Sequence, residues 1–407
     1  MRRVVVTGGG ALSPLGCDWP VIEASLRAGR SGITPCPLWE EYPDLRSRAA
    51  GVVSLPELPA SFDRKKIRGM SRAALLAVYA ADLALANAEL TGHPVITGGE
   101  TGVACGSCLG GPEALIELAA ACTRRQFRGL PATTFIKVMS HSCAANIGLF
   151  FGLTGRIIPT CSACTSGSQG IGFAWESIRA GTQTVMLAGG AEELCLGITA
   201  LFDTMLATSA RSAATPRPFD AGRDGLVTAE GAAVLVLEEL DHALARNAPI
   251  VAELVGFGTN SDGAHLTDPQ PETMSRAMRL SLASAGLRPE QIGFVHCHAT
   301  GTERGDIAES QATAAVFGST TPVGALKSYL GHTLGAAGAL ESWLTIRMMN
   351  SGWFAPVLNL EAPDTRCAPL AWITGAGLEI EPEHVMVNNF AFGGVNTSLI
   401  FKRWAGR

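Results

Sequence analysis

The sequence predicts an α/β protein, and two observations carry this prediction. Short apolar runs rich in β-branched residues alternate with longer segments of helical periodicity along the whole chain. Hydrophobic residues make up 47% of the 407 residues and charged residues only 16%, against about 25% charged in an average globular chain. A chain with so little charge buries a large core. Because strands alternate with helices, we expect mainly parallel sheets covered by helices.

Several short runs have the composition of buried strands. In chain order they span residues 4–7, 101–104, 184–187, 233–237, 252–257, 294–297, 385–387 and 397–401. Residues 72–90 and 273–285 have the apolar spacing of helices. A helix-like segment ends at Asn247 and a new strand follows, so we place a boundary between an N-terminal half, 1–249, and a C-terminal half, 250–407. No long Pro- or Ser-rich linker separates the halves, and we expect one globule.

Charge and hydropathy exclude several classes of function. A net charge of -5 without a cluster of Lys and Arg argues against a nucleic-acid partner. The apolar run at residues 4–6 stops at Thr7, which is too short for a signal peptide. No apolar run is long enough to span a membrane. We therefore expect a cytoplasmic protein whose 11 cysteines are mostly reduced.

The glycine clusters are predicted to form tight turns. Residues 8–10 are three glycines after a strand, which raises a dinucleotide-binding interpretation. The third glycine of that fingerprint would fall at position 13, which is Ser13, so a strand-to-loop turn is preferred. The pairs Gly189-Gly190 and Gly393-Gly394 are interpreted in the same way.

Cys164 is the first candidate for chemistry. It lies in the segment TCSACTSG (160–167), between an apolar strand and a helical pattern that ends at Gly181. A thiol at the start of a helix has its thiolate favoured by the helix dipole and by free backbone N–H groups. The alternative is a buried packing cysteine, and the turn alone leaves both interpretations open.

His298 is the second candidate, at the end of the strand at 294–297. His296, Cys297 and His298 together suggest a metal site. On a strand, however, the two histidines share one face while Cys297 points to the other, which makes a three-ligand site awkward. A histidine that opens into a polar loop is better suited to acid–base or hydrogen-bonding work. A core histidine is the structural alternative.

The segment KSYLGH (327–332) precedes a helix predicted over 333–350, and Glu341 falls on the apolar stripe of that helix. A carboxylate on a buried stripe is costly unless it is paired. Lys327, at the end of an apolar strand, is its natural partner. His332 begins the helix, where the dipole favours a neutral ring that donates a hydrogen bond. The alternative is a surface lysine and an incidental histidine.

The loop NNFAFGGVNT (388–397) is a weaker signal, since glycine-rich backbone can approach a ligand and stabilise an oxyanion. Taken together, these motifs resemble those of the β-ketoacyl-acyl carrier protein synthases, the elongating condensing enzymes of the thiolase superfamily. The matching segments are VVVTG at the start, ACTSGS around Cys164, RPFDxxRDG at 217–225, HATGTxxGD at 298–306, KSYLGH at 327–332 and NxFxFGGxN at 388–396. The resemblance implies a thiolase-like five-layered α-β-α-β-α fold of two similar βα halves. It also implies a dimer that acts on acyl carrier protein, with no cofactor and no metal.

The resemblance further implies catalytic roles at the matching positions. Cys164 is expected to be the nucleophile that carries the acyl chain as a thioester. His298 and His332 are expected to assist malonyl decarboxylation and to stabilise the enolate that results. Lys327 and Glu341 match the ion pair that supports them.

Four more positions match binding or gating residues of the family. The backbone N–H groups of Cys164 and Phe392 match the oxyanion hole, and Phe392 also matches a gate that senses acylation. Thr300 and Thr302 match residues that contact the pantetheine arm. Leu109 matches a residue that lines the acyl tunnel.

Two departures from the family pattern bear on the pathway. Ala391 stands where the gating loop commonly has glycine, and the segment 139–143 is more polar than in fatty-acid enzymes. In these motif sequences the chain most resembles ketosynthases of aryl polyene and other type II polyene clusters. A housekeeping fatty-acid ketosynthase is the alternative within the family. A chain-length-factor-like subunit typically lacks the nucleophile, and a degradative thiolase has a second cysteine in place of the two histidines. The partner in the dimer, a second copy or a chain-length-factor-like homologue, is left open.

Overall fold

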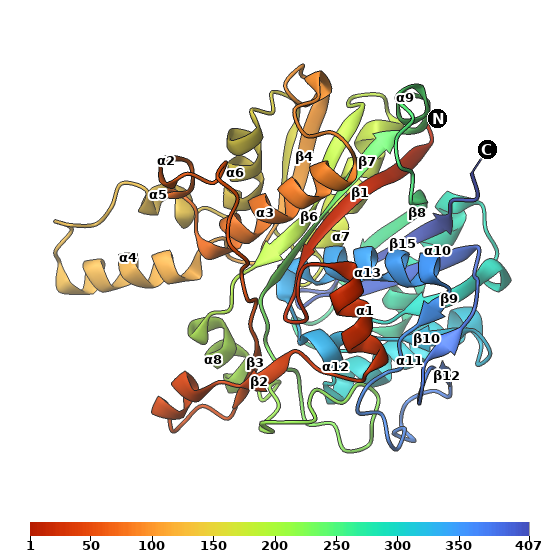
Figure 1. Cartoon of the computed structure of the whole chain (residues 1–407). Helices are drawn as coiled ribbons and strands as arrows, with labels where there is room; N and C mark the ends of the chain where they lie inside the picture. Colours follow the sequence, from red (N-terminus) through yellow and green to blue (C-terminus); the bar gives the residue numbers. More distant parts are fainter. Residues whose placement is uncertain (407) are drawn as a thin grey trace.

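The computed structural model describes residues 1–406, and each predicted strand overlaps a strand of the structure (Figure 1). The strands are β1 (Val4–Leu12), β2 (Ile33–Pro35), β3 (Ala49–Gly51), β4 (Thr101–Gly106), β5 (Ile157–Thr160), β6 (Val185–Glu192), β7 (Gly231–Glu239), β8 (Ala252–Ser261), β9 (Ile292–His296), β10 (Pro322–Gly324), β11 (Trp353–Phe354), β12 (Ala371–Trp372), β13 (Leu378–Glu379), β14 (His384–Phe390) and β15 (Val395–Arg403).

The predicted helices at 72–90 and 273–285 correspond to α3 and α10. The helices are α1 (Trp19–Arg27), α2 (Arg64–Ile67), α3 (Arg72–Asn87), α4 (Pro112–Arg124), α5 (Thr134–Lys137), α6 (Ser142–Phe151), α7 (Ser166–Arg179), α8 (Leu196–Thr204), α9 (Leu240–Ala245), α10 (Pro271–Ala285), α11 (Glu303–Phe317), α12 (Lys327–Leu330) and α13 (Ala337–Ser351). Within residues 1–406 none of them is long and apolar enough to cross a membrane.

The order of strand pairings is repeated in the two halves. In the first, β1 pairs antiparallel with β7 and β7 antiparallel with β6, while β6–β4 and β4–β5 are parallel. In the second, β8, β15, β14, β9 and β10 repeat that order of pairings. The expectation of mainly parallel sheets is therefore wrong. Strands buried on both faces are apolar throughout whichever way they pair, so their composition does not reveal direction.

The helices complete five layers. The halves meet where β1 pairs with β8, and α7 and α13 lie between the two sets of strands, in contact with each other. Helices α3 and α6 cover the outer face of the N-terminal half, and α10 with α11 covers that of the C-terminal half (Figure 1). The α-β-α-β-α architecture implied by the resemblance is confirmed.

Most of the clustered glycines allow close packing and do not form turns. Residues 8–10 lie inside β1, and Gly189 and Gly190 lie inside β6. A Cβ at Gly10 would lie 2.2 Å from the Ala80 carbonyl oxygen of α3, closer than two such atoms can approach. The turn interpretation is wrong for these residues. They are glycines within strands, where the absence of a side chain lets the backbone of a neighbouring element approach closely. The turn interpretation holds for the 393–394 pair, whose φ angles are +89° and +75°.

The fold brings the ends of several strands to one place. Strand β9 ends at His296, β10 at Gly324 and β14 at Phe390, and each is followed by a segment that carries candidate residues. These ends face the start of α7, where the turn after β5 carries Cys164.

Candidate active site

Cys164 sits in a braced turn between β5 and α7. Ala163 has a left-handed φ of +50°, an uncommon conformation for a residue with a side chain. Ser166 donates from Oγ to the Ala163 carbonyl at 2.7 Å, and Thr160 donates from Oγ1 to the Ser166 carbonyl at 2.8 Å. The turn therefore holds the thiol in place, and the residue is only 5% exposed.

His332 directs an N–H group at the nucleophile. Its Nδ1 accepts the Leu334 backbone N–H at 3.3 Å, so the proton of the neutral ring is on Nε2. That Nε2 lies 3.0 Å from the Cys164 sulfur. The imidazole is therefore a donor toward the thiol, and its lone pair faces the backbone.

His298 has the same tautomer for a different reason. Its Nδ1 accepts from the Lys327 ammonium at 3.2 Å and from the Asn389 side-chain amide at 3.3 Å, which leaves the proton on Nε2. The His298 and His332 rings lie edge to face, with centroids 5.1 Å apart. The site thus carries two N–H donors beside one thiol.

Lys327 and Glu341 form the buried ion pair that the helix stripe predicted. The Lys327 ammonium donates to Glu341 Oε1, and the two side chains are 1% and 2% exposed. Asn389 donates to the other carboxylate oxygen of Glu341 at 2.7 Å. Glu341 thus holds both the Lys327 ammonium and the Asn389 amide in place, and these are the two groups that donate hydrogen bonds to Nδ1 of His298.

Sequence reasoning missed Asn389 and Glu309 as site residues. The two carboxylate oxygens of Glu309, on α11, accept the backbone N–H groups of His298 and Ala299, both at 2.6 Å. Burial raises the pKa of Glu309 to about 8. Asn389 lies inside the motif at 388–396, whereas Glu309 lies three residues beyond the motif at 298–306. The available signal for Glu309 was a carboxylate on the buried side of a helical segment.

Burial also controls the protonation of the three central groups. It raises the pKa of the Cys164 thiol to about 12, although Lys327 and the backbone N–H groups of Phe392 and Cys164 favour the thiolate. Burial and the Lys327 charge lower the pKa values of His298 and His332 well below the ordinary histidine value. At neutral pH the resting site therefore holds a thiol and two neutral imidazoles.

One electrostatic expectation from the sequence is wrong, and another, the neutral donor ring of His332, has a different cause from the one expected. A thiolate favoured by the helix start is not the resting state, because α7 begins at Ser166 and desolvation of Cys164 outweighs the dipole. His332 does not begin a long helix, because α13 starts at Ala337 after a short 3-10 turn, η4 (Leu334–Ala336). Its ring is kept neutral by burial and by Lys327.

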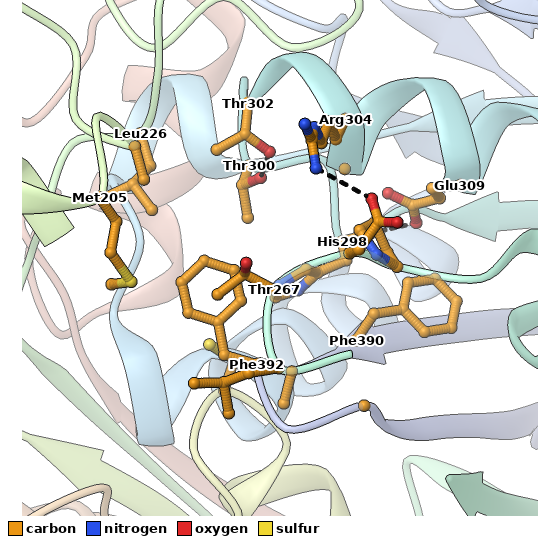
Figure 2. Close-up of a pocket in the computed structure, with 18 of the residues that line it drawn as sticks. Met205, Leu226, Thr267, His298, Thr300, Thr302, Arg304, Glu309, Phe390 and Phe392 are labelled. Atoms are coloured by element: carbon orange, nitrogen blue, oxygen red, sulfur yellow. Dashed lines mark hydrogen bonds and ion pairs between the residues drawn. The ribbon is translucent and has the colours of Figure 1, made fainter. Parts of the chain in front are cut away.

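A pocket of about 530 Å³ connects this cluster to the surface (Figure 2). Cys164, His298 and His332 line its inner end. Thr300 and Thr302 line it farther out, with their hydroxyl oxygens 2.9 Å apart. The remaining lining residues that matter here are Phe392, whose ring lies 5.6 Å from that of Phe202, and Arg304, which pairs with Asp268 at 3.2 Å.

Three expected site residues do not line the pocket: Lys327 and Glu341 act on it through His298, whereas Leu109 lies apart from the cluster. Leu109 follows β4, is 41% exposed and is not among the residues that line the pocket. Its role in an acyl tunnel stays a prediction.

The three ligand atoms of Cys164, His298 and His332 lie within 4.8 Å of one another, a spacing that also suits a metal ion. The donor set argues against this interpretation. If Nε2 of His298 bound a metal, the proton would move to Nδ1 and point at the Lys327 ammonium. Strand β9 ends at His296, and Cys297 packs in the outer core of the C-terminal half. Among residues 1–406 the ligand atoms of His296, Cys297 and His298 do not converge on one point.

The Cys-x-x-Cys pairs Cys105/Cys108 and Cys161/Cys164 have zinc-ligand spacing as well. Cys105 packs in the outer core of the N-terminal half, and the Cys161 thiol donates to the Cys108 carbonyl at 3.2 Å. Among residues 1–406 these four thiols do not converge on one point.

Known proteins share both the sequence and the fold of this chain. Residues 1–243 match the profile of the Beta-ketoacyl synthase N-terminal domain, and residues 251–361 match that of the C-terminal domain. A 3-oxoacyl-[acyl-carrier-protein] synthase 1 from Haemophilus influenzae is 38% identical over all of both chains. The crystal structure of a β-ketoacyl synthase from Burkholderia phymatum is 52% identical, with a TM-score of 0.97 over 99% of this chain and 100% of that one.

A third relative is the ishigamide ketosynthase/chain length factor, which is 31% identical with a TM-score of 0.91 over 99% of this chain and 100% of that one. Identity at this level over the whole chain, with a cysteine and two histidines facing one another in a pocket, shows a family and not only a fold. The chain belongs to the β-ketoacyl-acyl carrier protein synthases of the thiolase superfamily.

Proposed function

We propose that this 3-oxoacyl-[acyl-carrier-protein] synthase elongates an acyl chain held on Cys164, using malonyl-acyl carrier protein, in the biosynthesis of an aryl polyene or related polyketide. One observation carries the reaction: His298 and His332 both have their proton on Nε2 and line the same pocket end as the Cys164 sulfur. Two N–H donors at one point suit an oxygen that gains negative charge.

The first half-reaction transfers the acyl group. The Cys164 sulfur attacks the thioester carbonyl of acyl-acyl carrier protein, and a new C–S bond forms. The backbone N–H groups of Cys164 and Phe392 point to the sulfur and lie where they can donate to the carbonyl oxygen as it becomes an oxyanion. The C–S bond to the carrier then breaks, and the carrier thiol leaves with the proton that Cys164 gives up.

The second half-reaction makes the new carbon–carbon bond. The bond between the malonyl methylene and its carboxylate breaks, and carbon dioxide leaves. The electron pair forms an enolate whose oxygen accepts from Nε2–H of His298 and His332. The enolate carbon attacks the thioester on Cys164, which releases a β-ketoacyl-carrier thioester and restores the Cys164 sulfur, which then regains a proton.

The outer pocket accounts for the remaining assignments. We assign Thr300 and Thr302 to the amides of the pantetheine arm, because their hydroxyls line the passage between the surface and Cys164. Phe392 stands beside the thiol and is assigned as the gate. Leu109 is assigned to an acyl tunnel that is completed outside the pocket described above.

The polyene pathway rests on the polar segment 139–143 and on the Ala391-Phe392 sequence of the gating loop. Fatty-acid elongation is the second candidate, since no feature of the pocket selects a conjugated chain over a saturated one. The two pathways differ in the acyl group that Cys164 accepts.

The decisive experiment incubates the purified chain with a mixture of saturated and conjugated polyenoyl carrier-protein thioesters and records the intact mass. An acyl adduct that is absent in Cys164→Ala supports the nucleophile, and the preferred acyl group decides between the pathways. An adduct on saturated chains alone would overturn the polyene assignment. No adduct, even with a chain-length-factor-like subunit added, would overturn acyl transfer.

We further propose that the functional unit is a dimer of two copies of this chain. Strand β5 ends the strand order, with unpaired backbone groups on one side. Helix α4 and the segment that follows it extend away from the body (Figure 1). Large exposed apolar side chains lie in this stretch of chain: Leu109, Leu115, Ile116, Phe127, Phe135, Leu149 and Ile157. A second copy would cover both the strand edge and these side chains, and would place Leu109 in an interface.

A further inference from the structure

Glu192 is a buried carboxylate that the proposed reaction does not use. It is the last residue of β6, has 0% exposure and does not line the pocket. One of its oxygens, Oε2, accepts the backbone N–H of Cys108 at 2.7 Å and that of Gly335 at 3.1 Å. The other oxygen, Oε1, has no hydrogen-bond partner.

The two N–H groups belong to segments that are far apart in the sequence and meet at the active site. Cys108 follows β4, which is paired with β5 and so lies next to the strand that leads to Cys164. Gly335 lies in η4, three residues after His332. A single carboxylate oxygen therefore joins the segment that bears His332 to the strand ends beside the nucleophile.

Leu334 of η4 packs in a small apolar cluster that Cys108 also contacts, and elsewhere the backbones of these segments approach closely. A Cβ at Gly190 would lie 2.3 Å from the Gly335 carbonyl oxygen, and one at Gly167 would lie 2.9 Å from the same oxygen. No side chain at these glycines can interlock to hold η4 against α7. The hydrogen bonds to Glu192 therefore add a directional, polar attachment to the packing of Leu334 near Cys108.

We propose that Glu192 is a positioning residue, which holds His332 at the Cys164 sulfur by binding the Cys108 and Gly335 N–H groups on one oxygen. The proposal deepens the function proposed above and rests on it. A second effect follows from charge, because Glu192 is among the groups that raise the pKa of the Cys164 thiol. The charged or titratable groups facing Cys164 are Lys327, His298, His332, Cys108 and Glu192. Those facing Glu192 are Cys108, Cys143, Cys161, Cys164 and Glu193.

The two effects are separated by two substitutions. Glu192→Gln keeps an oxygen for both N–H groups and removes the charge, and it also changes the contact between the carboxylate and the Cys108 thiol. Glu192→Ala removes both the oxygen and the charge. Glu193→Gln is the matched control, because Glu193 carries the same charge but accepts the N–H groups of Ala73 and Glu113, which open α3 and α4.

The first measurement is the rate at which iodoacetamide alkylates Cys164 from pH 6 to pH 9, followed by mass spectrometry of the peptide that contains Cys164, because exposed cysteines such as Cys122 and Cys161 also react. Burial raises the pKa of Glu192 to about 7, so the wild-type carboxylate is neutral at pH 6 and charged at pH 9. We expect Glu192→Gln to react about threefold faster than wild type at pH 9 and equally fast at pH 6, a shift of about half a pKa unit. Glu193→Gln should react at the wild-type rate at pH 9, with its transition at a lower pH than in wild type, because the Glu193 charge contributes to the raised pKa of Glu192. Parallel profiles for wild type and Glu192→Gln would overturn the charge effect.

The second measurement is acyl transfer from a saturated acyl-carrier thioester, below the melting temperature of every variant. We expect Glu192→Ala to lower kcat about tenfold or more with KM unchanged, because His332 is displaced. Glu192→Gln should restore kcat to within about threefold, since its hydrogen bonds are kept. Wild-type kcat in Glu192→Ala, or no rescue by Gln, would overturn the positioning role. If wild type forms no adduct, the proposed function fails, while the alkylation profile still tests Glu192.

Discussion

At the level of single residues, the chemistry of the site depends on where each imidazole keeps its proton. Lys327 and Asn389 fix it for His298, and the Leu334 N–H fixes it for His332. The two histidines are not equivalent, however, because only His332 contacts the Cys164 sulfur. Substitutions at the two positions should therefore affect different steps.

We expect His298→Ala to form the acyl adduct on Cys164 and to fail in decarboxylation. The sulfur keeps its contact with His332, but the enolate loses one of its two donors, which costs about a hundredfold or more in rate. Intact mass measures the first step and release of carbon dioxide from malonyl-carrier protein measures the second. A variant that still condenses would contradict the assignment.

Removal of one partner of the buried ion pair should destabilise the fold. Glu341→Ala leaves the Lys327 ammonium buried without its carboxylate, and we expect a loss of about 3 kcal/mol or more in the free energy of unfolding. The control is Glu383→Ala, which breaks the exposed pair with Lys402 and should cost less than about 1 kcal/mol. Denaturant unfolding of the two variants checks the contrast, and equal small losses would count against a buried pair.

His296 links stability to pH. Burial and the Lys327 charge lower its pKa to about 3, so below pH 6.5 the unfolded chain binds a proton there that the folded chain does not. The stability that the neutral His296 contributes to the folded state is fully present above pH 6.5 and is lost as the pH falls toward 3. We expect His296→Leu to gain about 2 kcal/mol relative to wild type between pH 7.5 and pH 5. Urea unfolding at both pH values measures this difference, and the other buried histidines cancel because both proteins contain them.

Single residues also show how far sequence reasoning reaches. Glu341 was identified from its place on an apolar helix stripe, and Lys327 was the nearest cation at a strand end; the structure confirms the pair. Asn389 and Glu192 were not identified, because their partners lie 48 and 143 residues away. Periodicity describes the environment of a residue within its own element, and it carries no information about contacts between elements.

At the level of elements, glycines inside strands set the distances between layers. Gly190 in β6 brings that strand against the Gly335 carbonyl, and Gly8 and Gly10 bring β1 against α3. The glycine clusters were visible in the sequence, but they were interpreted as turns. Glycine is used both in turns and where two backbones pack closely, so composition alone does not separate the two roles. Strand direction was missed for a related reason, since both kinds of pairing bury the same apolar side chains.

Gly190→Ala should disturb the active site as well as the fold. The added Cβ would meet the Gly335 carbonyl at 2.3 Å, and overpacking of this kind costs about 1–3 kcal/mol. Gly8→Ala is the control, with its Cβ 2.6 Å from the Ala84 carbonyl of α3 and away from the pocket. We expect both variants to melt at lower temperature, and only Gly190→Ala to acylate Cys164 more slowly at a temperature where both are folded. Equal acylation rates would show that η4 adjusts without moving His332.

At the level of the whole molecule, exposed apolar side chains are concentrated on one part of the surface. The stretch from 109 to 157 exposes a series of large apolar side chains, although the chain has a formal net charge of -5. Exposed apolar surface of this kind marks interaction sites in monomeric structures. The sequence predicted dimerisation only through the family resemblance, because residues 115 and 116 look like core residues until the helix that carries them is seen to extend outward.

The proposed dimer makes a direct prediction about mass in solution. We expect the wild-type chain to have the mass of two copies by light scattering, and Phe135→Glu, at a 69% exposed position, to shift it toward one. Leu280→Glu, on the outer face of the C-terminal half and 38% exposed, should leave the mass unchanged. A wild-type monomer that doubles in mass only with a chain-length-factor-like subunit would replace the homodimer with a heterodimer.

Because both imidazoles keep their proton on Nε2 and their Nδ1 lone pairs are taken by donors outside the pocket, neither can remove a proton from the methyl group of an acetyl thioester. In the proposed reaction the carbanion must come from a carbon–carbon bond made beforehand by a carboxylating enzyme. Carbon dioxide escapes once that bond breaks, so the extension does not run backward. The tautomers of two histidines thus determine that growth of the product consumes carboxylated units and proceeds in one direction only.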